Sequence, residues 1–441
     1  MRTQGPPLRL LALLLLGLPP SAAAQPEDAR PAGPALEPGS VIGYDQVGRL
    51  KPFLPADFWD NRDFFFYPGM QLEIGPTGAD YSPAKEYAAA TERYRGQAQI
   101  GPDQSLQGYR GGQPFPMREI DCRGDPQAGA KIMWNHRYQW GGAGGQTRFF
   151  YSYWDRGEQL PLYYEGTGQA VQLARRVEKE FEETDGDVFR GEKRTGASGA
   201  EVDAPFDARG IALLTYRYKA SDGPRWETKN DDTWVYVPSL RRVRRISTAQ
   251  RTDAVAGTDF TLDDLFSFNG VVPQYHWKCL GEGLFLAPSN TKVKAYPYEK
   301  EHNFGPYGLS FADDRWELRD TVIVEMDPKN DDHPYSKKIL YLDKQTLESH
   351  YSFAYDTKDE LWKILIHNKR WSEDQSLTGD YYQPWEGIER PRDHHIVSDI
   401  IVNVQTGTGN RIEFWDRTGM PLASKGKIRR YIDVGRLTKG R

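Results

Sequence analysis

The sequence predicts a mainly-β fold of the α+β class, because strand patterns are frequent and helix patterns are rare. Aromatic residues make up 13% of the 441 residues, a content typical of β-rich proteins. After about residue 130, apolar and polar residues alternate with a period of two over several short segments. The clearest lie within residues 336–371, where "SKKILYL", "LESHYSFAY" and "ELWKILIHNKRW" are separated by the turns "DKQT" and "DTKD". We therefore expect these three segments to form an antiparallel meander.

One face of this meander is expected to be apolar and aromatic, and the other mostly solvated. Tyr351, Phe353 and Tyr355 alternate with Ser352 and Ala354 along the middle strand, and "WKILIHN" alternates in the same way along the third. The same period predicts further strands at 148–154, 211–220, 233–237, 321–326 and 400–405.

Helix signals are confined to two segments. The stronger pattern is "DYSPAKEYAAATERYRG" at 80–96, in which Ser82 is a suitable N-cap, Pro83 suits the first turn and Gly96 ends the helix. Residues 169–183, "QAVQLARRVEKEFEE", fit a helix and a strand about equally, because their apolar residues match both periods.

The chain begins with segments typical of exported proteins. Residues 1–24 combine arginines, an apolar run and the small residues "AAA", which together indicate a secretory signal peptide. Residues 25–38 are rich in Pro and Ala and predict a flexible leader. We expect an irregular and helical N-terminal extension over 39–115, and the β-rich part over 116–441. No later segment resembles a membrane-spanning helix, so the predicted location is the periplasm, as a soluble protein.

Composition and motifs argue against several classes of function. A formal charge of −5 argues against nucleic-acid binding, which needs a basic surface. The sequence contains no G-x-S-x-G, HExxH, paired CxxC or phosphate-binding glycine loop. The absence of these motifs does not exclude an enzyme, but it favours binding, so we expect no enzyme activity, no catalytic residue and no cofactor. Asp393, His394 and His395 could ligate a metal, but adjacent histidines on a strand point to opposite faces, so no metal site is expected.

The chain contains only two cysteines, Cys122 and Cys279. In an oxidising compartment they could form one disulfide that closes a long loop. They could equally be two separate buried thiols, because spacing alone does not show whether they meet.

A basic segment follows an aromatic strand at "TWVYVPSLRRVRRI", residues 233–246. Trp234 and Tyr236 share one face of the predicted strand. Such rings pack in a core more often than they line a ligand site, and composition alone favours the core. The basic segment is either a solvated strand end or a docking patch, and it contains Arg241, Arg242, Arg244 and Arg245.

Several segments together resemble the DUF1329 family of exported proteins of Gram-negative bacteria. They are "GGQPFPMREIDCRGDPQAGAKIMWNH" (111–136), "TWVYVPSLRRVRRI", "GTDFTLDDLFSFNG" (257–270), "YHWKCLG" (275–281) and "HPYSKKILYLDKQTLE" (333–348). Members of the family are described as similar to outer-membrane lipoprotein-sorting proteins of the LolA/LolB type. Their genes often lie beside genes for RND-type transporters and DUF1302-family proteins. The resemblance therefore implies these proteins as partners.

The resemblance also implies a fold and a site. LolA/LolB-type carriers have a large curved antiparallel sheet, an unclosed half-barrel, which wraps short helices and a lipid-binding cavity. In this chain the sheet would occupy 116–441 and include 169–183 as a strand, and 257–270 would form a lid or helix. The rings expected to line the cavity are Trp234, Tyr236, Phe260, Phe266, Phe268, Tyr351 and Phe353.

Three functions are compatible with these observations. The first is a periplasmic carrier for a lipid or other hydrophobic molecule, in which the rings hold the cargo and the arginines at 241–245 dock a partner. The second is an envelope regulatory or adaptor protein that binds another protein with the same fold. The third is a carbohydrate-active hydrolase or a carbohydrate-binding protein, in which Trp and Tyr stack on sugars.

Overall fold

The computed structural model of the protein describes residues 36–155, 158–223, 229–246, 251–292, 304–374, 392–419 and 425–438. The predicted signal peptide (1–24) and most of the predicted leader lie outside the described residues. Within the described ranges, no helix is both long enough and apolar enough to cross a membrane.

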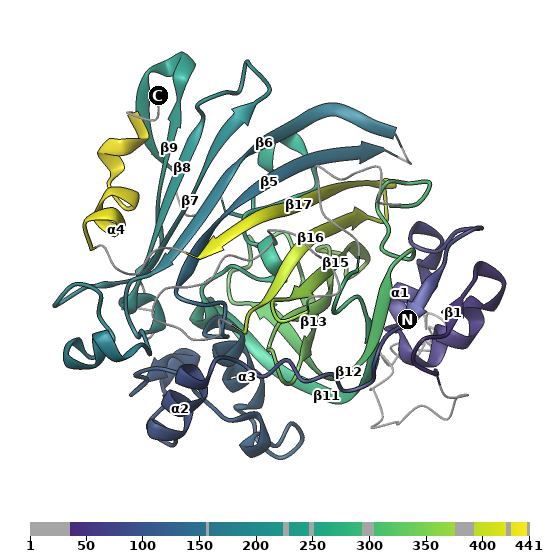
Figure 1. Cartoon of the computed structure of the whole chain (residues 1–441), viewed down its shortest axis with the longest axis horizontal. Helices are drawn as coiled ribbons and strands as arrows, with labels where there is room; N and C mark the ends of the chain where they lie inside the picture. Colours follow the sequence, from purple (N-terminus) through teal and green to yellow (C-terminus); the bar gives the residue numbers. More distant parts are fainter. Residues whose placement is uncertain are drawn as a thin grey trace, which may run out of the picture.

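Fifteen of the described strands form one large sheet, shown in Figure 1. Along the sheet the order is β1-β2-β12-β13-β14-β15-β16-β17-β5-β6-β7-β8-β9-β10, and β11 lies off this path and pairs with residues 317–328 of β12. The strands are β1 (Val41–Ile42), β2 (Leu72–Ile74), β5 (Gly144–Asp155), β6 (Glu158–Gln172), β7 (Arg194–Ala204), β8 (Ala212–Tyr218), β9 (Asp232–Val237), β10 (Arg242–Ile246), β11 (Tyr275–Ala287), β12 (Arg315–Pro328), β13 (Lys337–Asp343), β14 (Ser349–Tyr355), β15 (Leu361–Trp371), β16 (His394–Asn403) and β17 (Thr408–Gly419).

The remaining elements are short. β3 (Gln99–Ile100) and β4 (Leu106–Gln107) pair only with each other. The α-helices are α1 (Ala56–Asp60), α2 (Lys85–Arg93), α3 (Ala128–Arg137) and α4 (Lys425–Tyr431). The 3-10 helices are η1 (Tyr44–Phe53), η2 (Arg62–Phe64), η3 (Pro102–Gln104), η4 (Met117–Glu119), η5 (Lys179–Thr184), η6 (Lys219–Asp222), η7 (Pro238–Leu240), η9 (Val255–Gly257), η10 (Leu265–Ser267), η11 (Val272–Gln274) and η13 (Val434–Thr438).

The sheet is strongly curved, and contacts across one face show which face is concave. Arg217 on β8 donates a hydrogen bond of 2.6 Å to the backbone oxygen of Asn269, shortly before β11. Tyr138, at the end of α3, donates a hydrogen bond of 2.8 Å to Asp222 in η6, which follows β8. β8 and β11 lie near opposite ends of the strand order, so side chains of these regions can meet only across the concave face. The face that bears Arg217 is therefore the concave one.

The core of the concave face is built around α3. Ile132, Met133 and Trp134 are almost completely buried against apolar side chains of β11 to β13, such as Leu340. Burial of each such side chain contributes roughly 1.5–3 kcal/mol to folding. A Cβ atom at Gly129 would lie 2.7 Å from the backbone oxygen of Trp277, so the helix approaches β11 as closely as it does only with glycine at this position.

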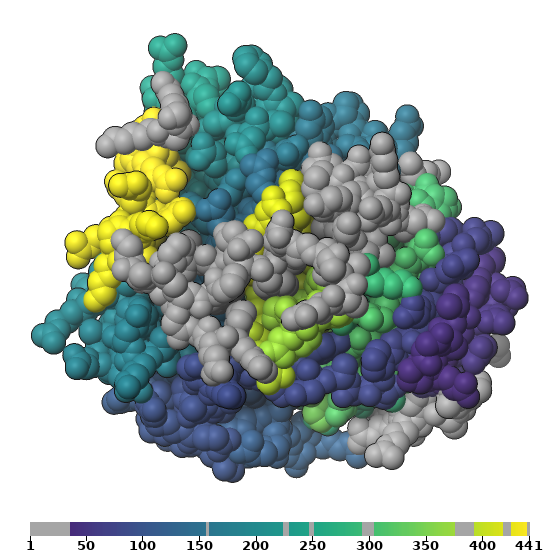
Figure 2. Space-filling model, viewed as in Figure 1, coloured from purple at the N-terminus to yellow at the C-terminus, as the bar shows by residue number. Residues whose placement is uncertain are grey.

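Residues 36–74 and 425–438, which begin and end the described part of the chain, cover the convex face. Residues 36–74 pack on β12 to β16 and bury a cluster that includes Phe58, Tyr351 and Phe353. At the other end of the sheet, α4 and η13 pack on β7 to β9 around Leu214 and Ile428. Figure 2 shows this C-terminal segment in yellow, lying against the teal strands.

The predicted meander is confirmed, but its predicted solvated face is wrong. β13, β14 and β15 pair antiparallel in sequence order. Ser352, Lys363 and His367, on the face opposite Tyr351 and Phe353, are at most 2% exposed. The reason is topological, because this is the concave face, and α3 and the residues before β11 cover it.

Other predicted elements are also found, with shifted bounds. The five additional strands correspond to β5, β8, β9, β12 and β16, and the sheet is unclosed, as the resemblance implies. The pairing is not wholly antiparallel, because β2 runs parallel to β12. In 80–96 the helix α2 starts at Lys85 without a side-chain cap, so Ser82 is not its N-cap. Residues 169–183 divide between the end of β6 and η5, so neither the helix nor the strand prediction holds throughout.

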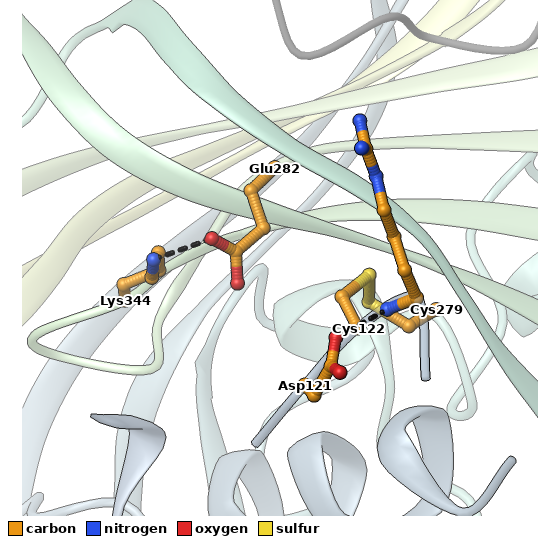
Figure 3. Close-up of a disulfide and its surroundings, with 6 residues drawn as sticks. Asp121, Cys122, Cys279, Glu282 and Lys344 are labelled. Atoms are coloured by element: carbon orange, nitrogen blue, oxygen red, sulfur yellow. Dashed lines mark hydrogen bonds and ion pairs between the residues drawn. A yellow bond between two sulfur atoms is a disulfide. The ribbon is translucent and has the colours of Figure 1, made fainter. Parts of the chain in front are cut away.

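Cys122 and Cys279 form a disulfide and are not two separate buried thiols (Figure 3). The bond joins the segment before α3 to β11, across a sequence separation of 157 residues. Close by, Lys344 and Glu282 form an ion pair of 2.6 Å. The disulfide therefore fastens the start of α3 to the concave face.

Candidate ligand-binding surface on the concave face

The concave face of β5 to β10 presents a continuous row of small and apolar side chains. Thr147 pairs with Gly168, Gly168 with Ala200, Ala200 with Leu213, and Leu213 with Val235. In the adjacent row, Phe149 pairs with Gly166 and Gly166 with Val202. We call these two rows the inner strip, which comprises Thr147, Phe149, Gly166, Gly168, Ala200, Val202, Leu213 and Val235.

The inner strip is half-buried rather than packed over. Phe149, Ala200, Leu213 and Val235 all retain partial solvent exposure, whereas the α3 side of the same face is buried. Glycine is needed beneath the Phe149 ring, because a Cβ atom at Gly166 would lie 2.9 Å from its Cζ atom. The small and apolar residues thus form a half-buried apolar surface along the sheet.

Residues 251–270, here called the bridging segment, border the inner strip. Phe260 packs edge-on against Tyr151 of β5, with ring centroids 5.8 Å apart. Phe266 contacts Phe414 of β17 at 5.9 Å and is 36% exposed, so its ring faces the open part of the concave side. Phe266 and Ser267 both have positive φ, at 55° and 70°, a conformation that only firm anchoring maintains in non-glycine residues. The segment is irregular and not the helix that the resemblance offered as an alternative.

A buried carboxylate supplies one anchor of the bridging segment. Asp264 accepts hydrogen bonds of 2.7 Å from Nζ of Lys338 and 2.7 Å from the hydroxyl of Tyr335. Lys363 lies 3.5 Å from the same carboxylate. Although burial alone would raise it, the pKa of Asp264 is held well below its usual range by the two lysines and their hydrogen bonds. Asp264 is therefore a buried anion between two cations of the sheet.

Ser267, His367 and Asp399 form a second anchor. Nε2 of His367 lies 2.5 Å from the hydroxyl of Ser267, and Nδ1 lies 2.6 Å from Asp399. Burial lowers the pKa of His367, so the imidazole is neutral, Nδ1–H donates to Asp399 and the Ser267 hydroxyl donates to Nε2.

These residue types also form the catalytic chain of serine hydrolases. Here Ser267 and His367 have no exposed surface, so no substrate reaches the Ser267 oxygen in this structure. The arrangement instead fastens the bridging segment to β15 and β16.

Strand β10 ends the sheet beside the inner strip and carries Arg242, Arg244 and Arg245, and Arg241 immediately precedes it. Arg244 pairs with Val235, so its side chain is on the face of the strip. Arg242 pairs with Val237 and points to the same side. Arg245 points to the convex side and forms an ion pair with Asp232, whereas Arg241 occupies a left-handed turn with φ 49°. All four arginines are exposed.

Residues 63–423 match the family described as "Protein of unknown function (DUF1329)". The chain belongs to the DUF1329 family. An uncharacterized protein of Pseudomonas aeruginosa is 24% identical over 351 residues, which cover 77% of this chain and 69% of that protein. The family predicted from the sequence is thereby confirmed.

Solved structures resemble this DUF1329 protein over most of its length. A DUF1329 family protein from Desulfovibrio piger matches 71% of this chain and 99% of that chain, with 18% identity and a TM-score of 0.45. A LolA superfamily protein from Nitrosomonas europaea matches 65% of this chain and 90% of that chain, with 12% identity and a TM-score of 0.34.

The seven rings predicted to line one cavity occupy four separate places in this DUF1329 protein, so the prediction of a single aromatic wall is wrong. Trp234 and Tyr236 pair with Leu214 and Ala212 and face the convex side, where Trp234 packs against Tyr216 at 4.7 Å. The strand alternates as predicted, but the resemblance assigned its rings to the opposite face.

The other predicted rings are divided between the two faces. Tyr351 and Phe353 are fully buried on the convex side beneath residues 36–74. Phe268 packs in the core around α3, 5.0 Å from Trp277. Only Phe260 and Phe266 border the inner strip.

Sequence reasoning missed the inner strip because its members are small or scattered. The available signal was the spacing of glycine and alanine in "YEGTGQAV" (164–171) and "GASGA" (196–200), which places small residues on one face of two strands. Pairing across non-adjacent strands is needed to bring them beside Phe149 and Leu213.

His394 and His395, the two histidines of the "DHH" segment, both pack against aromatic rings. His394 stacks on Tyr81 at 4.6 Å, whereas His395 contacts Phe414, on the concave side, at 6.4 Å. The two rings thus point to opposite faces, as predicted. Among the described residues, no group of three His, Cys, Asp or Glu side chains is placed to hold a metal ion.

Two hollows are lined largely by polar residues, although the lining of the first also includes Ala200 and Leu213 of the inner strip. One, of about 180 Å³, lies between β6 to β8 and η13 and includes Gln169, Glu201 and Arg436. The other, of about 370 Å³, includes Arg319 and Asp343. Their charged linings suit a hydrophobic guest less well than the inner strip does.

Proposed function

We propose that this DUF1329 protein is a periplasmic carrier or binding protein for a lipid or other hydrophobic molecule, which lies along the inner strip. The observation that supports the proposal is the half-buried apolar row across β5 to β9, with Ala200, Leu213 and Val235 in register. A hydrophobic ligand on this row would remove its own surface and that of the strip from water.

The expected affinity follows from the apolar surface removed. Each buried CH₂ group contributes roughly 0.8 kcal/mol, so a chain of ten groups gains about 8 kcal/mol. This would give a Kd of about 1 μM before the cost of ordering the ligand is subtracted. A carrier needs such moderate affinity, because it has to release its cargo.

An obstruction placed on the inner strip tests this function. Ala200→Trp fills the middle of the strip, whereas Asp207→Trp adds the same ring to the exposed β7–β8 connection. The probe is N-phenylnaphthylamine, a neutral dye whose fluorescence rises in apolar sites. We expect Ala200→Trp to weaken dye binding at least tenfold and Asp207→Trp to leave it unchanged, with both variants as stable as the wild type.

The proposal fails if the wild type does not bind the dye, or if Ala200→Trp binds it as tightly as Asp207→Trp does. Native mass spectrometry of protein purified from its own periplasm provides a second test. We expect a co-purified lipid in the wild type and less of it in Ala200→Trp.

A carrier in the periplasm also requires a partner that supplies or receives the cargo. An RND-type transporter, with a DUF1302-family protein, is the partner that we propose from the family resemblance. Cross-linking in the native envelope should recover such a transporter, and its recovery should decrease when Ala200→Trp blocks loading.

One observation favours a second candidate, an adaptor that binds a protein. β10 pairs only with β9 among the described strands, so its other edge is available for an added strand. Under this alternative, pull-downs return an envelope protein whether or not the inner strip is blocked.

A further inference from the structure

Two of the three arginines on β10 extend the rows of the inner strip. The register continues from Leu213 on β8 to Val235 on β9 and Arg244 on β10. Arg242 occupies the equivalent position in the adjacent row, opposite Val237. The apolar row therefore ends at two guanidinium groups that point to its own face.

Among the described residues, these two guanidinium groups have no counter-ion. No described residue forms an ion pair or a side-chain hydrogen bond with Arg242 or Arg244, whereas Arg245, on the opposite face of the same strand, is paired with Asp232. Along the inner strip beside them, the side chains of Leu213, Val235 and Ala200 carry no negative charge. An anion at this end of the strip would thus meet two unneutralised cations.

The dimensions suit an amphiphile. From Thr147 on β5 to Arg244 on β10 the row crosses five strand spacings, about 24 Å at ~4.8 Å each. One leaflet of a bilayer hydrocarbon core is about 15 Å thick, half of the whole core, so one lipid tail fits along the row. The strip then accommodates the tail while the head remains at the exposed arginines.

We infer that the cargo is an amphiphile with an anionic headgroup, which is bound by Arg242 and Arg244 while its apolar tail lies on the inner strip. The inference rests on the proposed carrier function and specifies its ligand class. Planar guanidinium groups bind carboxylate and phosphate through paired hydrogen bonds, and either headgroup satisfies the site. Trp234 and Tyr236 have no role in this site, because they face the other side of the sheet.

The experiment compares two probes and two sets of variants in the full mature chain. Dansyl-undecanoic acid is anionic, and its methyl ester has the same tail without the charge. Arg242→Ser combined with Arg244→Ser removes both cations of the strip. Arg245→Ser is the matched control, since it removes an arginine of the same strand from the opposite face.

We expect the wild type to bind the acid about fivefold to tenfold more tightly than the ester, as two exposed charge contacts allow. The double variant should lose this preference and bind the ester unchanged, whereas Arg245→Ser should retain it. Raising the salt concentration from 0.05 to 0.5 M should weaken binding of the acid alone.

The outcomes separate the two levels of the proposal. If neither probe binds the wild type, the carrier function fails. If both probes bind equally, or if Arg245→Ser abolishes the preference as the double variant does, the anionic headgroup is wrong and the carrier function stands. If the double variant loses capture of an acidic envelope protein but not the preference for the acid, the arginines dock a protein and the inference is overturned.

Discussion

The hydroxyl of Ser267 lies 2.5 Å from Nε2 of His367, although the two residues are 100 positions apart in the sequence. This contact ties the bridging segment to the centre of the sheet. It also completes a hydrogen-bonded chain to Asp399. Together with Asp264, it holds the segment that borders the inner strip in a single, irregular conformation.

Ser267→Ala is expected to destabilise the protein by about 1–3 kcal/mol, because it leaves Nε2 of the buried His367 without a partner. Urea unfolding measures the loss, with the exposed Ser198→Ala as a control that should change stability by less than about 0.5 kcal/mol. A fluorophosphonate probe should not label Ser267 in the folded protein. Labelling at this residue would instead support nucleophilic chemistry and contradict a purely structural role.

Asp264→Asn should cost about 3–5 kcal/mol of stability, because Lys338 and Lys363 then remain buried beside each other without an anion. Asp253→Asn, at an exposed position of the same segment, should have little effect. Adding Lys338→Met to Asp264→Asn should restore part of the stability. If Asp264→Asn is neutral, the carboxylate does not anchor the bridging segment.

Replacing Cys122 and Cys279 by serine removes a cross-link across 157 residues. The chain-entropy model predicts a loss of up to about 5 kcal/mol, because the unfolded chain regains the freedom that the loop had removed. Unfolding with and without a reductant measures the effect: the wild type should lose stability on reduction, and the double serine variant should not respond. A wild type indifferent to reduction would show that the bond contributes nothing.

Glu317 gives a pH prediction with a defined sign. Burial raises its pKa to about 7, and the hydroxyl of Tyr81 donates to both carboxylate oxygens. A folded pKa above the unfolded value of about 4.5 means that the group stabilises the fold in acid and loses this contribution as pH rises to about 7. Glu317→Gln should therefore gain about 3 kcal/mol relative to the wild type between pH 4.5 and 8.

The comparison for Glu317→Gln is Asp320→Asn, an exposed carboxylate on the same strand. Its unfolding is measured over the same range of pH as the matched control. A Glu317→Gln variant that follows the wild type in parallel across this range would show that the carboxyl is ionised in the folded protein.

The meander and most strand positions could be predicted from sequence, because alternation along a strand is a local property. Tyr351, Phe353 and Ile364 alternate with Ser352 and Lys363 as expected. Alternation does not reveal how much protein covers each face. The alternation predicts a solvated Lys363, yet this side chain is buried. Burial is possible because the bridging segment, about 100 residues earlier in the sequence, provides Asp264 as the counter-ion.

The candidate site was harder to predict, because it depends on sheet pairing and on the chain ends. Trp234 and Tyr236 share a face, as their spacing requires. α4 and η13 cover that face, and the sequence around residues 234–236 contains no pattern that predicts this contact. The inner strip joins Gly168, Ala200 and Leu213 from three strands, and only their register brings them together. For the arginines, the sequence could predict exposure but not which of them face the strip.

Photo-cross-linking of a bound fatty acid tests the central claim most directly. A palmitic acid that carries a diazirine in its tail is bound to the protein and irradiated, and the labelled residues are located by peptide mass spectrometry. The account predicts labels on β8 and β9, at or beside Leu213 and Val235, which decrease in Ala200→Trp. Labels confined to the convex side, at Tyr351 and Phe353 or at Tyr431 near the C-terminus, would contradict it.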